Sequence, residues 1–300
     1  MNIETLRIFC DVIQHQSFSR GAAVNDISQS AATQSVHRVE QYFGVQLVNR
    51  GKRPFVLTPE GQVCYEGFRE VLELYESVEA RVQSLKKEIS GTVRVAAIYS
   101  VGLHDMSRCM QQFMRSYPKA KVRLEYLRPN KVVDAVVNAE ADLGIISYPN
   151  ATPDLNITPL RSERMVLICH PEHALARQDA VTAEHLDGEE FIAFDRDLNI
   201  RKEIDRYFRQ RSVKVQVVME FDNIETIKQA VQIGAGVSIL PEPTVQKETR
   251  GRSLATVRLI APELQRPVGI IHRQRKVFGP TIGKFIELLQ ESQKSDRKES

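Results

Sequence analysis

The chain has 300 residues, enough for two domains or three lobes, and its 42% hydrophobic content suits a soluble globular protein. No stretch approaches the roughly 18 consecutive apolar residues of a membrane-spanning helix, and no basic region or cleavage site marks an export signal, so we expect a cytoplasmic protein. The formal net charge of +3 is too small to indicate a nucleic-acid partner by itself.

The cysteine and histidine patterns indicate neither a disulfide framework nor a metal site. Cys10, Cys64, Cys109 and Cys169 are far apart and form no CxxC pair, which fits buried, reduced thiols. The seven histidines also lack metal-ligand spacing, so we expect no metal and no cofactor. The sequence contains no nucleophile elbow, phosphate loop, zinc-protease motif or dinucleotide motif, which argues against an enzyme, the main alternative class.

Residues 1–58 are predicted to form three helices followed by a hairpin. The first helix shows one apolar face, and Ser17 or Ser19 can cap a short second helix rich in small residues. Ser28 can cap a third helix that ends at Gly44. On periodicity alone, a generic three-helix bundle remains an alternative to a helix-turn-helix.

The third predicted helix and the hairpin carry the side chains expected to contact DNA. The helix has short hydrogen-bonding side chains and hardly a carboxylate on its outer face, as reading base edges in a major groove requires. The hairpin, over residues 47–57, would bring basic groups to phosphates or a minor groove. The predicted DNA contacts are Ser28, Gln29, Ser30, Thr33, Gln34, His37 and Arg38 on the helix and Arg50, Lys52 and Arg53 on the hairpin.

Residues 59–90 are predicted to form one long helix with an apolar stripe. Thr58 can cap it, Pro59 suits its first turn and Gly91 can end it. The stripe repeats at alternating steps of three and four residues, the heptad pattern of a coiled coil. The predicted dimerisation seam consists of Phe68, Val71, Tyr75, Val78, Val82 and Leu85.

Charges beside this seam favour an antiparallel pair of helices. An antiparallel pair would match Glu79 with Lys86 and Arg81 with Glu88, whereas a parallel pair would set Arg81 against Lys86. A helix that faces the core of its own domain is the alternative, because further leucines widen the stripe.

From residue 91 onward, predicted strands and helices alternate, which indicates sheets covered by helices. Residues 148–159 contain three prolines and are expected to form a loop, and the polar residues 292–300 are expected to be disordered. Asp222 and Glu225 form a possible capping box at the start of a helix. The predicted strands cover residues 92–98, 121–127, 143–147, 165–170, 191–194, 213–221, 237–240 and 268–271.

Several motifs resemble those of LysR-type bacterial transcriptional regulators. In the first domain these are the runs at residues 17–23, 27–40, 44–47 and 57–61, together with Arg50. The chain departs from the family pattern at three positions, with Ser30 in place of a proline, Gln34 in place of a basic residue and Val48 in place of an aromatic. Gln34 could read adenine where a basic residue would favour guanine or phosphate, so the operator preference stays open.

The rest of the chain resembles the effector domain of the same family over nearly its full length. The matching segments are residues 91–95, 141–145, 165–168 with 171–173, and 234–241. The resemblance implies two α/β lobes of periplasmic-binding-protein type. The expected domains are a winged helix-turn-helix over 1–58, a linker and dimerisation helix over 59–90 and an effector domain over 91–300, with lobe I at 91–163 and 266–300 and lobe II at 164–265.

An effector is expected between the lobes, at strand ends and helix starts. Ser100 matches the hydroxyl position that holds effectors in the family, and free N–H groups beside it suit a carboxylate or a similar anion. Each of the other candidates has an equally plausible role as a cap or wall residue. The predicted effector contacts are Tyr99, Ser100, Val101, Ser147, Tyr148, Phe194 and Asn223.

The function implied is sequence-specific transcriptional regulation, modulated by a small, anionic effector. The expected partners are promoter DNA, a small-molecule co-inducer, further copies of the chain in a homodimer and homotetramer, and RNA polymerase, with no membrane. A plain solute-binding protein is the second alternative, and the helix-turn-helix argues against it.

Overall fold

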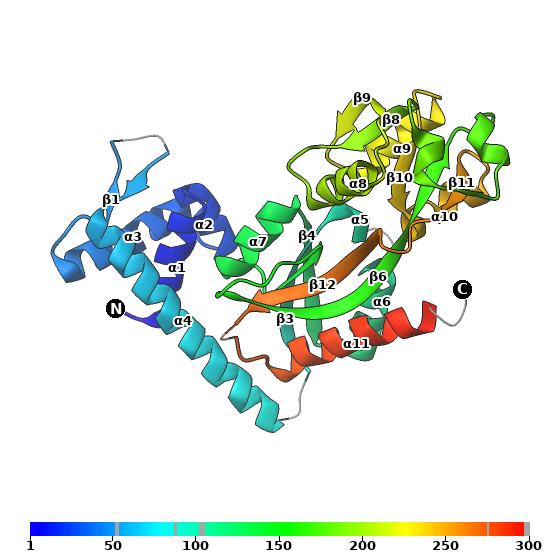
Figure 1. Ribbon diagram of the computed structural model, residues 1–300. Coiled ribbons are helices and arrows are strands. Elements are labelled where there is room, and N and C mark those ends of the chain that lie inside the picture. Colours follow the sequence, from blue (N-terminus) through cyan, green and yellow to red (C-terminus); the bar gives the residue numbers. More distant parts are fainter. Residues whose placement is uncertain (52–53, 87–88, 102–105, 275, 297–300) are drawn as a thin grey trace. The chain divides into compact units, whose positions relative to one another are not determined.

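The computed structural model of the chain describes residues 1–51, 54–86, 89–101, 106–274 and 276–296 (Figure 1). Contacts divide the chain into two compact units, residues 1–88 with 276–280 and residues 89–275 with 281–300. The first unit holds helices and a small hairpin, and the second combines sheets with helices. This architecture confirms the predicted fold class.

Three short helices open the first unit, and each is capped by a side chain. They are α1 (Ile3–Gln14), α2 (Phe18–Val24) and α3 (Gln29–Phe43). The side chains of Asn2, Ser17 and Ser28 accept hydrogen bonds from N–H groups of the first turns, so Ser17 rather than Ser19 is the cap of α2. Gly44 ends α3 with a φ of 70°, a left-handed conformation that favours glycine. The hairpin consists of the antiparallel strands β1 (Val48–Asn49) and β2 (Val56–Leu57).

These helices pack with the start of α4 (Pro59–Lys86) around a common core, and we call this assembly the head. Gly21 permits close packing, because a Cβ there would lie 2.7 Å from the Val12 backbone. The ring of Phe68 stands edge-on to the buried ring of Phe9, with 5.5 Å between centroids, and Leu72 is buried in the same core. The assignment of Phe68 to the dimerisation seam is therefore wrong, because its ring completes the core of its own head.

The rest of the predicted seam lies on an open face of α4. It consists of Val71, Tyr75, Val78, Val82 and Leu85, and this set is called the seam below. Leu85 is 84% exposed and the other four side chains are 40–49% exposed. Apolar side chains at heptad spacing that are exposed in a single chain favour packing against a partner helix. The predicted charge pairs involve Lys86 and Glu88, which lie outside the described side chains.

Within the described residues, the second unit is built on an eight-stranded sheet in the order β4-β3-β5-β12-β6-β11-β7, with β10 also paired to β6. Strand β3 is parallel to β4 and β5, whereas β12 is antiparallel to β5 and β6. A separate parallel pair joins β8 and β9. The strands are β3 (Gly91–Ala97), β4 (Ala120–Tyr126), β5 (Leu143–Ser147), β6 (Leu155–Cys169), β7 (Ala180–Val181), β8 (Glu190–Phe194), β9 (Gln216–Phe221), β10 (Ser238–Pro241), β11 (Ala255–Leu259) and β12 (Gln265–Arg273).

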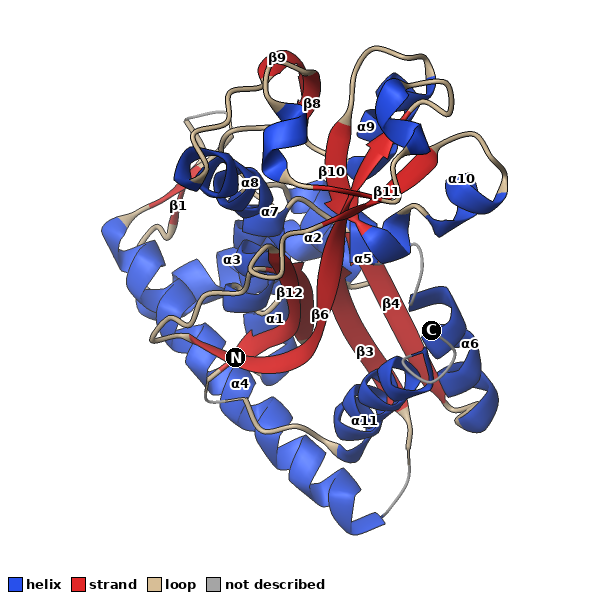
Figure 2. Cartoon of the chain, turned by 45° about the vertical axis from the view of Figure 1, so that its right-hand side comes forward, coloured by secondary structure: helices blue, strands red, loops and turns tan. Residues whose placement is uncertain are grey.

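Strand β6 connects the two lobes of this unit (Figure 2). Its first part pairs with β12 as far as Arg164, and from Met165 onward it pairs with β10 and β11. We call the β3–β4–β5–β12 side lobe I and the β7–β11 side lobe II. The expected loop over residues 148–159 is confirmed for 148–154 and wrong for 155–159, which belong to β6. Pro159 lies at a register shift in the β6–β12 ladder, where an absent N–H is tolerated.

Helices cover both lobes, and several of these helices begin close to the end of a strand. Asn223 rather than Asp222 caps α9, since its side chain accepts the N–H of Thr226. The last helix extends to Asp296, so the expected disorder from residue 292 is wrong for residues 292–296. The helices are α5 (Tyr99–Val101), α6 (Ser107–Ser116), α7 (Pro129–Val137), α8 (Asn199–Gln210), α9 (Ile224–Gln232), α10 (Gln246–Arg250) and α11 (Pro280–Asp296), with 3-10 turns at Ala174–Arg177, Ala183–Leu186 and Glu242–Thr244.

Candidate functional site

The outer face of α3 is a polar surface on the head. Among the predicted DNA contacts, Ser28, Gln29, Ser30, Gln34, His37 and Arg38 are exposed and Thr33 is half-buried. Four of these residues also have local contacts. Ser28 Oγ caps the helix and bonds to Ser30 Oγ, Thr33 Oγ1 donates to the carbonyl of Gln29, and His37 Nε2 lies 3.3 Å from the side-chain nitrogen of Gln41. Gln34, His37 and Arg38 are exposed and carry hydrogen-bonding groups of the kind that base contacts need.

The hairpin is fixed to α3 by Glu40, a residue that sequence reasoning did not select. One Glu40 carboxylate oxygen accepts the N–H groups of Leu47 and Val48, at 3.1 and 3.3 Å. The other lies 3.1 Å from the Arg50 guanidinium, which also stands 5.6 Å over the Phe18 ring. Arg50 is thus held by its own head and remains half-exposed. A phosphate bound to Arg50 would therefore share its guanidinium group with Glu40. The predicted contacts Lys52 and Arg53 lie outside the described residues.

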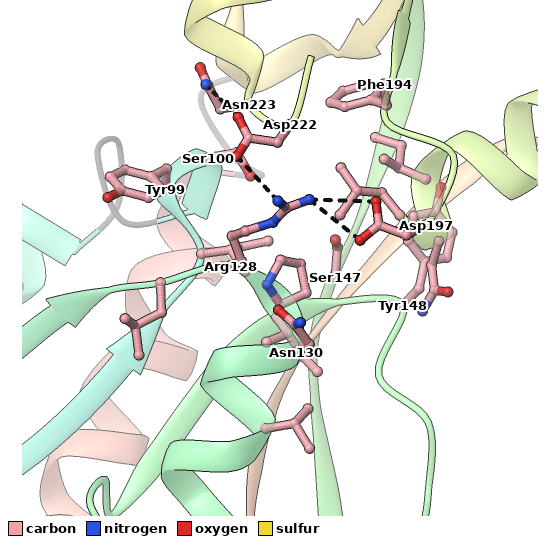
Figure 3. A pocket seen from close by; sticks show the side chains of 18 of the residues that line it. Tyr99, Ser100, Arg128, Asn130, Ser147, Tyr148, Phe194, Asp197, Asp222 and Asn223 are labelled. Atoms are coloured by element: carbon pink, nitrogen blue, oxygen red, sulfur yellow. Dashed lines mark hydrogen bonds and ion pairs between the residues drawn. The ribbon is translucent and has the colours of Figure 1, made fainter. Parts of the chain in front are cut away.

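A cleft of about 670 Å³ lies between the lobes of the second unit (Figure 3). Six of the seven predicted effector contacts line it, namely Tyr99, Ser100, Ser147, Tyr148, Phe194 and Asn223. Val101 does not line the cleft, and this assignment is wrong, because its side chain is 1% exposed in the core of lobe I. Most of the cleft wall is apolar, with Ile98, Leu127, Pro129, Val133, Ile146, Leu155, Leu198, Ile200, Ile224 and Ile271.

The floor of the cleft contains a buried arginine, Arg266, at the start of β12. One of its terminal nitrogens donates to Glu163 at 3.0 Å and the other donates to the Ser100 hydroxyl. The remaining Nε–H has no hydrogen-bond partner, although the side chain is only 2% exposed. Burial lowers the pKa of the Arg266 guanidinium, and the nearby Glu163 carboxylate opposes that shift.

Tyr148 is a second unusual residue at this floor. Its hydroxyl is buried without a hydrogen-bond partner, and burial raises its pKa to about 12. Its backbone has a φ of 50°, a left-handed conformation that is uncommon for a bulky residue, and its N–H donates to the carbonyl of Pro267. Strained backbone of this kind often occurs where a side chain must be held in place for function.

The mouth of the cleft is crossed by an ionic cluster. Arg128, which precedes α7 in lobe I, has a terminal nitrogen 3.3 Å from Asp195 and 3.4 Å from Asp197. The other terminal nitrogen is 3.8 Å from Asp222, and Figure 3 shows the guanidinium between Asp197 and Asp222. All three carboxylates belong to lobe II, and we call them the aspartate group.

Sequence reasoning missed Arg128, Asp197 and Arg266. Arg128 and Asp197 follow predicted strands and could have been selected by the same strand-end rule that selected Ser147 and Phe194. Arg266 carries no such signal, because it lies within a strand and only the pairing of β12 with β6 brings it to Glu163, 103 residues away.

The described residues contain no cluster of carboxylates, histidines and cysteines suited to a metal ion. Cys10, Cys109 and Cys169 are buried, and burial raises the pKa of Cys10 to about 12 and that of Cys169 to about 11. Of the helices in the described part of the chain, none is both long and apolar enough to cross a membrane.

A helix-turn-helix head joined to a two-lobed domain with a ligand-sized cleft defines a DNA-binding protein that responds to a small molecule. Comparison with known families agrees with this class. Residues 3–62 match the bacterial regulatory helix-turn-helix proteins of the lysR family, and residues 86–294 match the LysR substrate binding domain. The chain belongs to the LysR family, and it is a DNA-binding transcriptional regulator with an effector-binding domain, not an enzyme.

The relatives and solved structures described here cover between 68% and 98% of this chain. The HTH-type transcriptional regulator YfeR of Shigella flexneri is 29% identical over 275 residues, which are 92% of this chain and 89% of that protein. A full-length OxyR variant from Pseudomonas aeruginosa has the same fold, with a TM-score of 0.78 at 24% identity over 98% of this chain and 95% of its own. The CcmR regulatory domain of Synechocystis, solved with 2-PG, is 26% identical, with a TM-score of 0.63 over 68% of this chain and 98% of its own.

Proposed function

We propose that this regulator responds to a small organic anion whose charged group binds at Arg266 and Ser100 on the floor of the cleft. The unpartnered Nε–H of the buried Arg266 is the observation that carries the proposal. A buried donor without an acceptor is unfavourable by about 1–3 kcal/mol, and by more for a charged group, so an anion at this position would be favoured.

The hydrogen bonds around Arg266 also favour an anion. Glu163 accepts from Arg266 through one oxygen and from Arg161 through the other, at 3.0 and 2.7 Å. Glu163 therefore does not serve Arg266 alone, and an anionic ligand would give the buried Arg266 guanidinium a second charged acceptor.

The rest of the cleft suits the body of an organic molecule. Its volume of about 670 Å³ is in the range of sites for drug-sized ligands, and its walls are mainly aliphatic and aromatic. An inorganic oxyanion would bury none of this apolar surface. We therefore infer a carboxylate or similar anionic group attached to an apolar body.

The position of the floor links binding to the arrangement of the lobes. Arg266 and Glu163 lie on β12 and β6, where β6 exchanges β12 for β10 and β11 as its partners. An anion held by Arg266 would contact the segment where the lobes join. Ligand binding there would change the balance between lobe arrangements and so change how the heads engage DNA.

We infer that the seam pairs antiparallel with a second copy in a dimer, and that dimers associate into tetramers in the cytoplasm. Oligomerisation is a property of LysR regulators, and the exposed seam supports the dimer. Gln34, His37 and Arg38 would read bases while residues of the hairpin contact phosphates. Contact with RNA polymerase would complete regulation at the promoter, and no cofactor besides the effector would be required.

Calorimetric titration of aliphatic and aromatic carboxylates into the full-length protein and its Arg266→Gln variant tests this proposal. We expect the tightest acid to lose about 10- to 150-fold in affinity, as removal of a charged hydrogen bond of about 1.5–3 kcal/mol implies. Arg266→Lys should restore part of the affinity because it keeps the charge. Arg164→Gln is the matched control, since Arg164 lies on β6 with a largely exposed side chain. Equal affinities in wild type and Arg266→Gln would contradict the proposal.

A further inference from the structure

We propose that Arg128 and the aspartate group form an ionic latch that keeps the two lobes together at the mouth of the cleft, so that a ligand enters or leaves when the latch opens. The latch would control access to the cleft of the proposed function, on which this inference rests. Control of ligand exchange at the mouth is separate from the contacts that hold the ligand on the floor.

The chain joins the two lobes on the floor side of the cleft. Strand β6 passes from lobe I to lobe II, pairing with β12 as far as Arg164 and with β10 from Met165 onward. The chain returns between Leu259, the end of β11, and Gln265, the start of β12 and the neighbour of the floor residue Arg266. An opening motion would therefore turn the lobes about the floor and separate them most at the mouth.

Arg128 connects the lobes at the mouth, where such a motion would be largest. Its terminal nitrogens lie 3.3 Å from Asp195, 3.4 Å from Asp197 and 3.8 Å from Asp222 (Figure 3). Asp195 and Asp197 follow β8, whereas Asp222 follows β9, so one guanidinium holds the ends of two lobe II strands. A planar guanidinium with several donors suits a position shared by three carboxylates better than an ammonium does.

The segments that Arg128 holds also form the lobe II wall of the cleft. Asp197 directly precedes Leu198, and Asp222 directly precedes Asn223, and both of these neighbours line the cleft. Asn223 also caps α9, so the wall segment after β9 is tied to a helix start. Release of Arg128 from the aspartate group would therefore free the lobe II wall to move away from lobe I.

The strength of these contacts suits a latch that opens and closes. Pro129 restricts the preceding Arg128 to an extended backbone, with φ of −65° and ψ of 152°, which helps to hold its side chain across the mouth. Arg128 is 43% and Asp195 34% exposed, so the charges are partly shielded from solvent but not buried. A partly exposed ion pair changes an equilibrium by up to about fivefold, so we expect about five- to tenfold for the three contacts acting together.

Access to the cleft can be measured without an added ligand by labelling a thiol inside it. Ser147→Cys replaces a half-buried hydroxyl that lines the cleft by a thiol of similar shape. The labelling rates of N-ethylmaleimide and of the larger, rigid N-(1-pyrenyl)maleimide are compared, and peptide mass spectrometry separates this thiol from the native cysteines. The larger reagent needs a wider mouth, so the ratio of its rate to that of N-ethylmaleimide increases as the cleft opens.

In the Ser147→Cys background, Arg128→Gln should raise this ratio about five- to tenfold. Replacement of all three residues of the aspartate group by asparagine should raise it by a similar factor, although Arg128 keeps its full size in that variant. Adding Arg128→Gln to the three-asparagine variant should then have little further effect, because the contacts are already lost. An increase in NaCl from about 0.05 M to about 0.5 M should raise the ratio only in proteins that retain the latch.

Lys131→Gln is the matched control. Lys131 is also at the start of α7, and its Nζ lies 3.0 Å from Asp134 of the same helix. Its replacement removes a cation from an exposed ion pair within lobe I and breaks no contact between the lobes. We therefore expect the labelling ratio of Lys131→Gln to equal that of the parent protein.

An unchanged ratio in Arg128→Gln, or an equal increase in Lys131→Gln, would overturn the latch. A full effect of Arg128→Gln in the three-asparagine variant would also overturn it, because Arg128 would then be a steric barrier and not an ionic contact. The proposed function is tested separately by calorimetry with Arg266→Gln. The labelling experiment needs no ligand, so the latch can be confirmed when the floor assignment fails, and the reverse also holds.

Discussion

Replacing both Val71 and Val78 by aspartate should convert the protein into monomers. The two side chains are 47% and 49% exposed on α4, so a partner helix would cover at most about half of each side chain. Full burial of a valine is worth at least about 1.5 kcal/mol, so each would contribute about 1 kcal/mol in each chain. In a two-fold symmetric dimer each substitution occurs in both chains. The four replaced valines together therefore account for about 4 kcal/mol of lost apolar contacts.

The introduced carboxylates add a further cost, because four negative charges would enter an apolar seam without partners. A total above about 5 kcal/mol corresponds to a dimer dissociation constant raised by more than about a thousandfold. Sedimentation equilibrium or light scattering at micromolar concentration would then show the mass of one chain, 34.1 kDa.

Val63→Asp is the matched control for this experiment. Val63 is 71% exposed on the same helix, away from the heptad positions, so its replacement should leave the mass unchanged. Circular dichroism would establish that each variant is folded. An unchanged oligomeric mass in the Val71/Val78 variant would refute the assignment of the seam to dimerisation.

Further predictions concern the head, the cleft and the thiols. Thr33→Ala with Gln34→Ala should weaken specific DNA binding by about 1–3 kcal/mol per lost base contact and leave binding to random DNA nearly unchanged, and equal losses in gel-shift titrations would exclude base reading. Ser100→Ala should weaken effector binding in calorimetry by about 0.5–1.5 kcal/mol without changing DNA affinity measured in the absence of effector. A loss of both would indicate misfolding instead. Cys10 and Cys169 should resist alkylation at pH 8 in the native protein, because pKa values of about 12 and 11 leave fewer than about one thiol in a thousand ionised. Rapid labelling of either in native mass spectrometry would contradict their burial.

Local signals predicted the elements of the head well. The caps at Ser17 and Ser28 and the left-handed turn at Gly44 depend on neighbouring residues only, so the sequence contains what is needed to find them. Phe68 shows the limit of periodicity, because the same apolar stripe serves the head core at one end and an open face further along α4. A heptad pattern does not show whether an apolar position packs into the core of its own head or against a second chain.

The cleft was only partly predictable for a related reason. Residues after strand ends could be selected from the sequence, and Ser100 and Tyr148 do line the cleft. Arg266 could not be selected, because its importance arises from burial beside Glu163 and Ser100, which are 103 and 166 residues away. The full extent of β6 was hidden by Pro159, since a bulge accommodates a proline that a propensity rule treats as a strand breaker.

A crystal structure of the protein with the tightest-binding organic acid would test the floor assignment most directly. We expect a carboxylate oxygen within about 2.7–3.2 Å of Arg266 Nε, with the Ser100 hydroxyl beside it and the body of the acid against the apolar walls. An acid bound elsewhere on the protein, or one that turns its carboxylate away from Arg266, would contradict the proposed mode of effector recognition.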